Sequence, residues 1–361
     1  EKAGVWPGVN TSSIVTSLFC LFATMFIQAQ APSRSLTPEE FQRFDRDGSG
    51  QLDEVEKQAA LAFLRAGNAP PQDTETRKQE SVPSVGPVGE VKRVHSGFQF
   101  TEGPAADGAG NLYFTDPRAS VIYISHTDGR LSTFLEDTRG ANGLMFDAQG
   151  RLVVCQGGEG RVVSLDVQDI GVKVIADRYD GQRFNAPNDL VLVPGGGVYF
   201  TDPAFREGPQ DHEGVYHVDD KGVVTRVIDD LPRPNGILLS PDSKTLYVLP
   251  SGNPVVMAYP VTSSGQLGQG RLLAALERSG DGMTVDEKGH LYVTQPSLSG
   301  VVVLSPEGKA LGFLPVPESP SNCAFGGADR KTLFITARTS LYSYQMKVAG
   351  HGLAHQIESR E

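Results

Sequence analysis

The sequence is poor in the features that mark several large classes of protein. It has only three cysteines and one tryptophan in 361 residues. Apart from Cys20 near the N-terminus, only Cys155 and Cys323 are present, too few for a disulfide framework, and both are expected to be buried thiols. Basic residues are also scarce, because 32 Lys and Arg against 43 Asp and Glu give a net charge of -11. That sign disfavours a protein that binds nucleic acid through its phosphates.

Several catalytic signatures are missing as well. The sequence contains no G-x-S-x-G, no H-E-x-x-H, no P-loop and no G-x-G-x-x-G. Their absence argues against a serine hydrolase, a zinc peptidase, a nucleotide hydrolase and a dinucleotide enzyme. What the chain has in excess is glycine and proline, with 41 and 24 residues. This composition favours many short strands joined by turns over a helical bundle.

The N-terminal segment is typical of an export signal. Residues 11–29 form an uncharged apolar run, followed by the small-x-small pattern Ala29-Gln30-Ala31. We interpret residues 1–31 as a cleaved signal peptide, which predicts a periplasmic or secreted protein without a stable membrane span. The alternative is an uncleaved N-terminal membrane anchor, although the strongly apolar part, 14–27, is short for a 20-residue span.

A calcium-binding loop follows, within residues 35–66. Oxygen-bearing residues occupy loop positions 1, 3, 5, 7, 9 and 12, and Gly50 stands at position 6, where the chain must turn sharply. The predicted calcium ligands are Asp45, Asp47, Ser49, Gln51, Asp53 and Glu56. The pattern predicts a single EF-hand whose protein partner, if it has one, is not indicated; the alternative is an acidic surface turn. Residues 67–90, polar and rich in proline, are expected to be a linker.

The rest of the chain repeats a short unit. Apolar strand-like runs recur, and a polar motif precedes each of them. These motifs are Glu102-Gly103-Pro104, Asn142-Gly143-Leu144, Asn188-Asp189-Leu190, Asn235-Gly236-Ile237, Asp281-Gly282-Met283 and Asn322-Cys323-Ala324. Their first residues are 40, 46, 47, 46 and 41 positions apart, the period of a four-stranded propeller blade. We predict an all-β, six-bladed propeller over residues 91–348, with residues 349–361 as a C-terminal tail.

Residues at the same phase of each blade should converge at one end of the central channel. Glu102 and Asp281 would bring carboxylates there, and Asn188 and Asn235 would bring amide oxygens. These are the donors that a hard divalent cation prefers, so we expect Ca²⁺, with Mg²⁺ or another divalent ion as alternatives. The simpler alternative is that these Asn-Gly and Asp-Gly pairs only form turns.

Several of these segments together resemble the gluconolactonase and regucalcin (senescence marker protein) family of six-bladed propellers. They are TEGPAAD, RFNAPNDLVL, GVYFTDP, RPNGILLSPDSKTLYV, GDGMTVDEKGHLYV and SNCAFGGADRKTLFIT. The resemblance implies a metal-dependent hydrolase that opens a lactone, with Glu102, Asn235 and Asp281 as metal ligands and Asn188 reaching metal or substrate. The sequence departs from the animal members at Ala186, where they carry a substrate-binding arginine.

The expected mechanism is attack of an activated water on a lactone carbonyl that the cation polarises. Asp281 is the candidate catalytic base, provided that one of its oxygens stays free of the metal. Further candidate contacts to the small-molecule lactone are Asn142, Phe205 and Arg206. Two alternatives remain: a non-catalytic calcium-binding scaffold, since propellers host many unrelated functions, or a related hydrolase of aryl esters or phosphotriesters.

Overall fold

The computed structural model describes residues 36, 50–52, 57, 60–61 and 82–352, except 206–207 and 263–264. The expected signal peptide lies outside the described residues, as do the predicted calcium ligands Asp45, Asp47, Ser49, Asp53 and Glu56. Gly50 is described and has a φ of 74°, a left-handed conformation that a sharp turn needs. None of the described residues form a helix with the length and apolar character of a membrane span.

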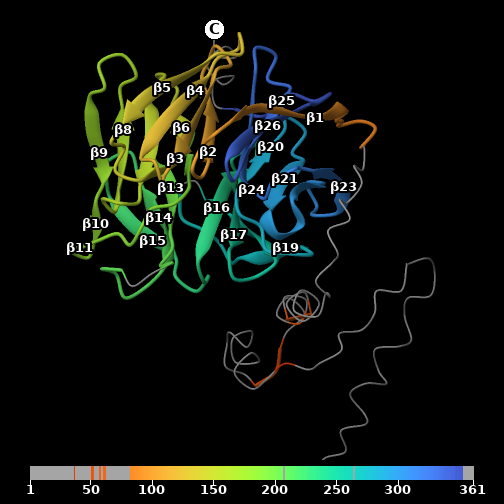
Figure 1. Ribbon diagram of the computed structural model, residues 1–361. Helices are drawn as coiled ribbons and strands as arrows, with labels where there is room; N and C mark the ends of the chain where they lie inside the picture. Colours follow the sequence, from red (N-terminus) through yellow and green to blue (C-terminus); the bar gives the residue numbers. More distant parts are fainter. Residues whose placement is uncertain are drawn as a thin grey trace, which may run out of the picture.

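The propeller prediction is confirmed: the described body forms six four-stranded antiparallel sheets, arranged as blades in a ring (Figure 1). Blade 1 has β2 (Glu102–Ala106), β3 (Leu112–Asp116), β4 (Val121–Ser125) and β5 (Leu131–Glu136); blade 2 has β6 (Ala141–Phe146), β7 (Leu152–Gln156), β8 (Arg161–Leu165) and β9 (Val172–Ala176); blade 3 has β12 (Leu190–Leu192), β13 (Val198–Asp202), β14 (Gly214–Val218) and β15 (Val224–Ile228). Blade 4 has β16 (Pro234–Leu239), β17 (Thr245–Pro250), β18 (Val255–Pro260) and β19 (Arg271–Ala275); blade 5 has β20 (Met283–Val285), β21 (Leu291–Gln295), β22 (Gly300–Leu304) and β23 (Ala310–Pro315). The short β10 (Arg178–Tyr179) and β11 (Gln182–Arg183) form a separate ribbon, and η1 (Pro296–Leu298) is a single 3₁₀ turn.

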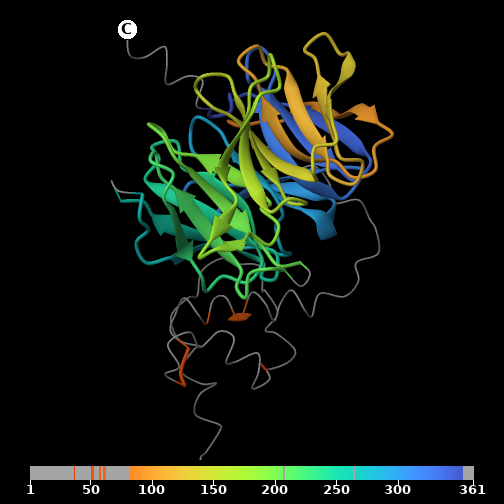
Figure 2. The same cartoon turned by 90° about the vertical axis from the view of Figure 1, so that its left-hand side faces the viewer.

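The ring closes by combining the two ends of the body in blade 6. This blade contains β24 (Pro320–Gly326), β25 (Thr332–Ala337) and β26 (Ser340–Gln345), and its fourth strand is the N-terminal β1 (Val88–Ser96), which pairs antiparallel with β26. Figures 1 and 2 show the orange β1 beside the blue C-terminal strands. β1 is the outer strand of blade 6, and its pairing with β26 ties the N-terminal end of the body to the C-terminal strands and so closes the ring.

The propeller body includes residues beyond the predicted boundaries at both ends. Val82 and Val85, which the sequence analysis placed in the linker, are buried against blades 5 and 6. Gly350 and His351, assigned to the tail, pair with blade 5: the His351 N–H donates to the Val285 carbonyl at 2.9 Å. The apolar alternation of β1 was too weak to mark it as a strand.

The core consists of apolar layers between neighbouring blades. One cluster, for example, joins Tyr199 of blade 3 to Val248 of blade 4. The second strand of most blades is buried on both faces, which explains runs such as LYFTD and LYVTQ. This packing holds the inner strands at fixed radius, so the residues at their starts are held in register around the channel.

Candidate functional site

The starts of the inner strands meet at one end of the channel, here called the motif end. Asn235 Nδ2 donates to Asp281 Oδ1 at 2.7 Å, across the boundary between blades 4 and 5. Glu102 of blade 1 is close enough to Asp281 for the charge of one carboxylate to raise the pKa of the other. The structure therefore brings together the three residues for which the resemblance implied metal ligation.

Glycine follows most of these residues because the neighbouring blade is too close for a side chain. A Cβ on Gly143 would lie 2.6 Å from Asp189 Oδ1. Gly103 has a φ of 46°, and a Cβ there would collide with the carbonyl oxygen of Asn142. These glycines let adjacent blades approach at the channel, which brings the side chains before them within reach of one another.

Threonine hydroxyls fix the main chain beside the site. Thr115 Oγ1 donates to the Asn142 carbonyl at 3.0 Å, which ties blade 1 to blade 2. Thr294 Oγ1 donates to the Ser321 carbonyl at 2.9 Å, which ties blade 5 to blade 6. Because these bonds cross blade boundaries and are partly or fully buried, they help to set the relative position of the inner strands.

Burial and mutual repulsion disfavour the charged forms of the carboxyl groups at the motif end. Burial, followed by repulsion from Asp281, raises the pKa of Glu102 well above its usual range. Burial, followed by repulsion from Asp189, raises the pKa of Asp281 to about 7, against an opposing hydrogen bond from Asn235. Among the described residues, no basic side chain contributes to lowering the pKa of any of these three acids.

Asp189 is the member of this cluster that sequence reasoning missed. It stands at the second position of its motif, where four other motifs have glycine, and burial raises its pKa to about 6. Its Oδ1 accepts the Leu190 N–H at 2.9 Å, and its Oδ2 accepts from Asn322 Nδ2 at 3.3 Å across the channel. In the sequence, Asp189 stands out as the one acidic residue at the second motif position, which holds glycine in four other motifs.

The donor set fits a hard divalent cation. Both Asn235 amide hydrogens are donated, to Asp281 and to Ser251 Oγ, which leaves the amide oxygen as an available donor atom. Glu102 and Asp281 add carboxylate oxygens that lack a neutralising basic side chain. Among the described residues, no group of three or more His, Cys, Asp or Glu side chains has a metal-binding arrangement. A cation at the motif end would therefore need the amide oxygen of Asn235 beside the carboxylates.

The remaining predicted contacts are placed less directly. Asn188 is half-buried beside the site, where its N–H donates to the Thr201 carbonyl and its own carbonyl accepts from Gly143. Asn142 is half-buried in the neighbouring blade. Phe205 is 54% exposed, and Arg206 lies outside the described residues.

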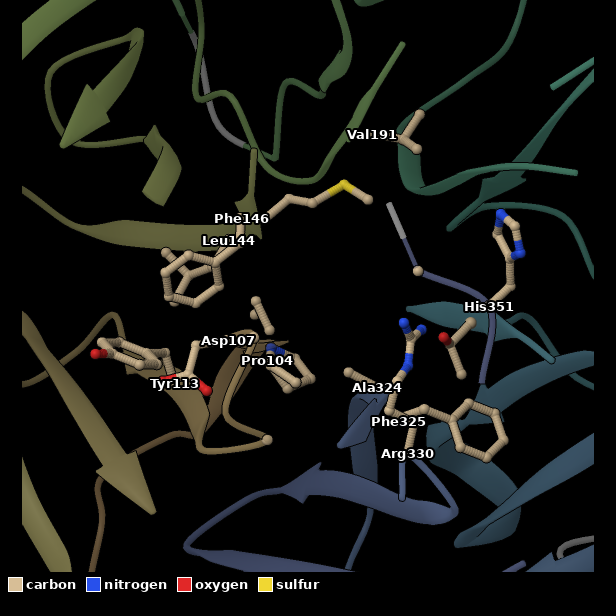
Figure 3. Close-up of a pocket in the computed structure, with 18 of the residues that line it drawn as sticks. Pro104, Asp107, Tyr113, Leu144, Phe146, Val191, Ala324, Phe325, Arg330 and His351 are labelled. Carbon is tan, nitrogen blue, oxygen red and sulfur yellow. The ribbon is translucent and has the colours of Figure 1, made fainter. Parts of the chain in front are cut away.

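A separate cavity opens at the other end of the channel, the turn end. It has a volume of about 850 Å³. Figure 3 shows Leu144, Val191, Ala324 and Arg330 around its open centre, with His351 of the C-terminal segment beside them. The cavity is also lined by Asp189 and Asn322, but not by Glu102, Asn235 or Asp281. The hydrogen-bonded Asp189–Asn322 pair therefore lies between this cavity and the motif end.

Comparison with known proteins places this arrangement in a family. The family model described as the SMP-30/Gluconolactonase/LRE-like region matches residues 100–339. The chain belongs to this family.

Two curated relatives and one solved structure show how close the likeness is. The gluconolactonase of Zymomonas mobilis is 30% identical over 295 residues, covering 72% of this chain and 82% of the relative. The 6-deoxy-6-sulfogluconolactonase of Pseudomonas putida is 29% identical over 238 residues, covering 63% and 76%. The structure of a gluconolactonase from Xanthomonas campestris superposes with a TM-score of 0.67 at 31% identity, covering 71% of this chain and 89% of that one.

Proposed function

We propose that the protein is a metal-dependent hydrolase that opens a sugar lactone. The observation that carries the proposal is the group of Glu102, Asn235 and Asp281 at the motif end, where buried acids have no basic counterpart. Relatives across the family that are named lactonases support the same reaction class. A cation of the Ca²⁺ type would be held by these three residues, with Asn188 beside them.

A divalent cation bound there would polarise the lactone carbonyl and stabilise the negative charge that develops on its oxygen. The chain's own residues orient the reacting groups and transfer a proton. Asp281 Oδ1 accepts from Asn235, whereas its Oδ2 accepts no hydrogen bond from the part of the chain that the structure describes. We assign Oδ2 to accept the proton of the attacking water, so that hydroxide adds to the carbonyl carbon, the ring C–O bond breaks, and the proton reaches the departing alcohol.

We propose that Asn188 orients the substrate. Its main chain is fixed on both sides by Thr201 and Gly143, so its side chain projects from a rigid base. We assign its amide to the lactone as well as to the cation. Asn142 and Phe205 are proposed to contact the rest of the sugar ring.

The decisive experiment is a pH-indicator assay with glucono-1,5-lactone, run with calcium and with chelator. The wild-type protein should open the lactone only with the cation, and Asp281→Asn should lower kcat by at least about 100-fold, as expected for loss of a general base. Asp147→Asn, at the turn end, is the control and should retain full activity. Full turnover by D281N at saturating calcium would refute the assignment of the base.

The same assay separates the alternatives. Hydrolysis of aryl esters or phosphotriesters in place of lactones would indicate a different substrate class on the same site. Calcium binding without hydrolysis of any ester would indicate a non-catalytic propeller and would refute the proposed function.

A further inference from the structure

Blades 1 and 3 carry the same local structure, although only their second strands look alike in sequence. Residues 113–117 and 199–203 are the identical pentapeptide YFTDP. Its aspartates, Asp116 and Asp202, lie at the motif end and are 1% and 0% exposed. A fully buried carboxylate must find hydrogen-bond donors, and both find them in the same place.

The two aspartates hold the segments that lead into Glu102 and Asn188. Asp116 Oδ2 accepts the N–H of Gln99 at 2.7 Å, and its Oδ1 accepts that of Phe100 at 3.2 Å. These amides lie three and two residues before Glu102.

Blade 3 repeats these two bonds, although Asp116 Oδ1 accepts one further amide, that of Ala119 at 3.1 Å. Asp202 Oδ2 accepts the N–H of Asn185 at 2.9 Å, and its Oδ1 accepts that of Ala186 at 2.7 Å. These amides lie three and two residues before Asn188. The same carboxylate atoms thus hold the same positions relative to a residue of the candidate site.

An aromatic pair completes each copy. Phe98 packs edge-to-face on Phe114, with ring centroids 5.1 Å apart at 84°. Phe184 packs on Phe200 in the same way, at 4.9 Å and 85°. Phe98 and Phe184 each stand four residues before the site residue of their blade, so the entering segment is fixed by one apolar and two polar contacts.

The other blades use different residues at the position of the aspartate. Gln156 of blade 2 and Gln295 of blade 5 donate through Nε2 to main-chain carbonyls, of Thr138 and Arg278 respectively. Blades 4 and 6 have Pro250 and Ala337 there. At this position of the second strand, a carboxylate that accepts two amides of the entering segment occurs, within the described residues, only in the blades that carry Glu102 and Asn188. For blade 4 a different residue, Glu213, accepts one such amide, that of Arg233, two residues before Asn235.

We propose that Asp116 and Asp202 are positioning residues that place Glu102 for cation binding and Asn188 for lactone binding. The part of this inference that concerns lactone binding rests on the proposed function, whereas the part that concerns cation binding is tested separately. A carboxylate that accepts two amides orients the main chain of the segment more tightly than a neutral group. Partners that orient metal ligands typically change cation affinity by about tenfold or more when they are replaced.

The test compares Asp116→Asn and Asp202→Asn for two separate quantities. Calcium affinity is measured by calorimetry in a Glu56→Gln background, which removes the contribution of the predicted EF-hand. D116N should raise the calcium Kd by about tenfold. D202N should raise the lactone KM by about tenfold, because Asn188 moves, and should raise the calcium Kd less than D116N does.

Two controls separate positioning from stability. Asp219 of blade 3 also accepts two main-chain amides, from Lys221 and Val223, but in a turn at the opposite end of the blade. Asp219→Asn should leave both Kd and KM unchanged. Val198→Ala, a buried truncation in the same blade, should lower the Tm without changing either quantity at 25 °C.

The outcomes decide the proposal. The proposal is overturned if both aspartate variants keep the wild-type calcium Kd and lactone KM. It is also overturned if both variants lose calcium and lactone affinity equally and V198A shows the same losses. If either variant does not fold, Phe98→Leu and Phe184→Leu loosen the same segments and should give the same division between Kd and KM. Should the wild-type protein open no lactone, the proposed function fails, and the calcium Kd of D116N still tests the positioning.

Discussion

Calcium should stabilise the protein strongly at alkaline pH and weakly at acidic pH. The experiment compares the Tm of the protein in calcium with its Tm in chelator, at pH 8 and at pH 5.5. Burial and repulsion raise the pKa of Asp281 to about 7, from an ordinary value of about 3.9. The folded protein without cation therefore keeps this proton between about pH 4 and pH 7, where the unfolded chain has lost it. The contribution of this proton to stability is fully present below about pH 4 and is lost as the pH rises through about 7.

The size of the effect follows from that shift. At pH 8 the charge on Asp281 costs the cation-free folded protein about 4 kcal/mol, from about three pKa units at 1.36 kcal/mol each. Calcium at about 100 times its Kd adds about 2.7 kcal/mol of stability. With an unfolding entropy of about 2.1 cal/mol/K per residue over the propeller body, that raises the Tm by about 5 °C.

The same calcium concentration should raise the Tm much less at pH 5.5 than at pH 8. This pH lies below the raised pKa of Asp281, so most of its carboxyl groups hold a proton that calcium must displace, and the same calcium concentration contributes clearly less stability than at pH 8. Differential scanning calorimetry of the Glu56→Gln variant measures this without the predicted EF-hand site. A Tm that calcium does not change at pH 8, or a larger increase at pH 5.5, would refute the reasoning.

Three further variants and treatments test neighbouring features of the site. Asp189→Asn removes a charge that raises the pKa of Asp281, so it should raise the Tm of the cation-free protein at pH 8 while weakening calcium binding; a lower Tm together with unchanged binding would contradict this. Gly143→Ala places a Cβ 2.6 Å from Asp189 Oδ1 and should cost about 1 to 3 kcal/mol of unfolding free energy in urea titrations. Gly108→Ala is the control, because neither glycine has a left-handed φ and a Cβ on Gly108 would meet no atom within 4 Å; an equal loss in both variants would contradict the collision. Cys155 and Cys323 are free and buried, so a thiol reagent should label neither in the native protein and both after unfolding; rapid native labelling would show that the blades open more readily than the packing implies.

The ring itself was predictable because propeller repeats leave a periodic record. Six motifs at nearly constant spacing gave the number of blades and the phase of Glu102, Asn235 and Asp281. Blade closure was not predictable in detail, because β1 alternates weakly and its partner β26 lies at the far end of the chain. A strand that is specified by a distant partner leaves little local pattern.

The electrostatics of the site needed coordinates. The sequence predicts two carboxylates around the channel, whereas the structure adds Asp189, whose motif gave it no distinct role. The equivalence of Asp116 and Asp202 also depends on contacts with residues that do not match in sequence, since Gln99-Phe100 and Asn185-Ala186 offer only their main-chain amides. Main-chain hydrogen bonds carry no side-chain signature, so sequence reasoning could not reach them.

A crystal soaked in Mn²⁺ and measured at an anomalous wavelength tests the central claim most directly. A difference peak in contact with oxygens of Glu102, Asn235 and Asp281, absent in the D281N variant, is the predicted result. A peak only in the cavity at the turn end, or none within the channel, would contradict a metal centre built by the six converging strand starts.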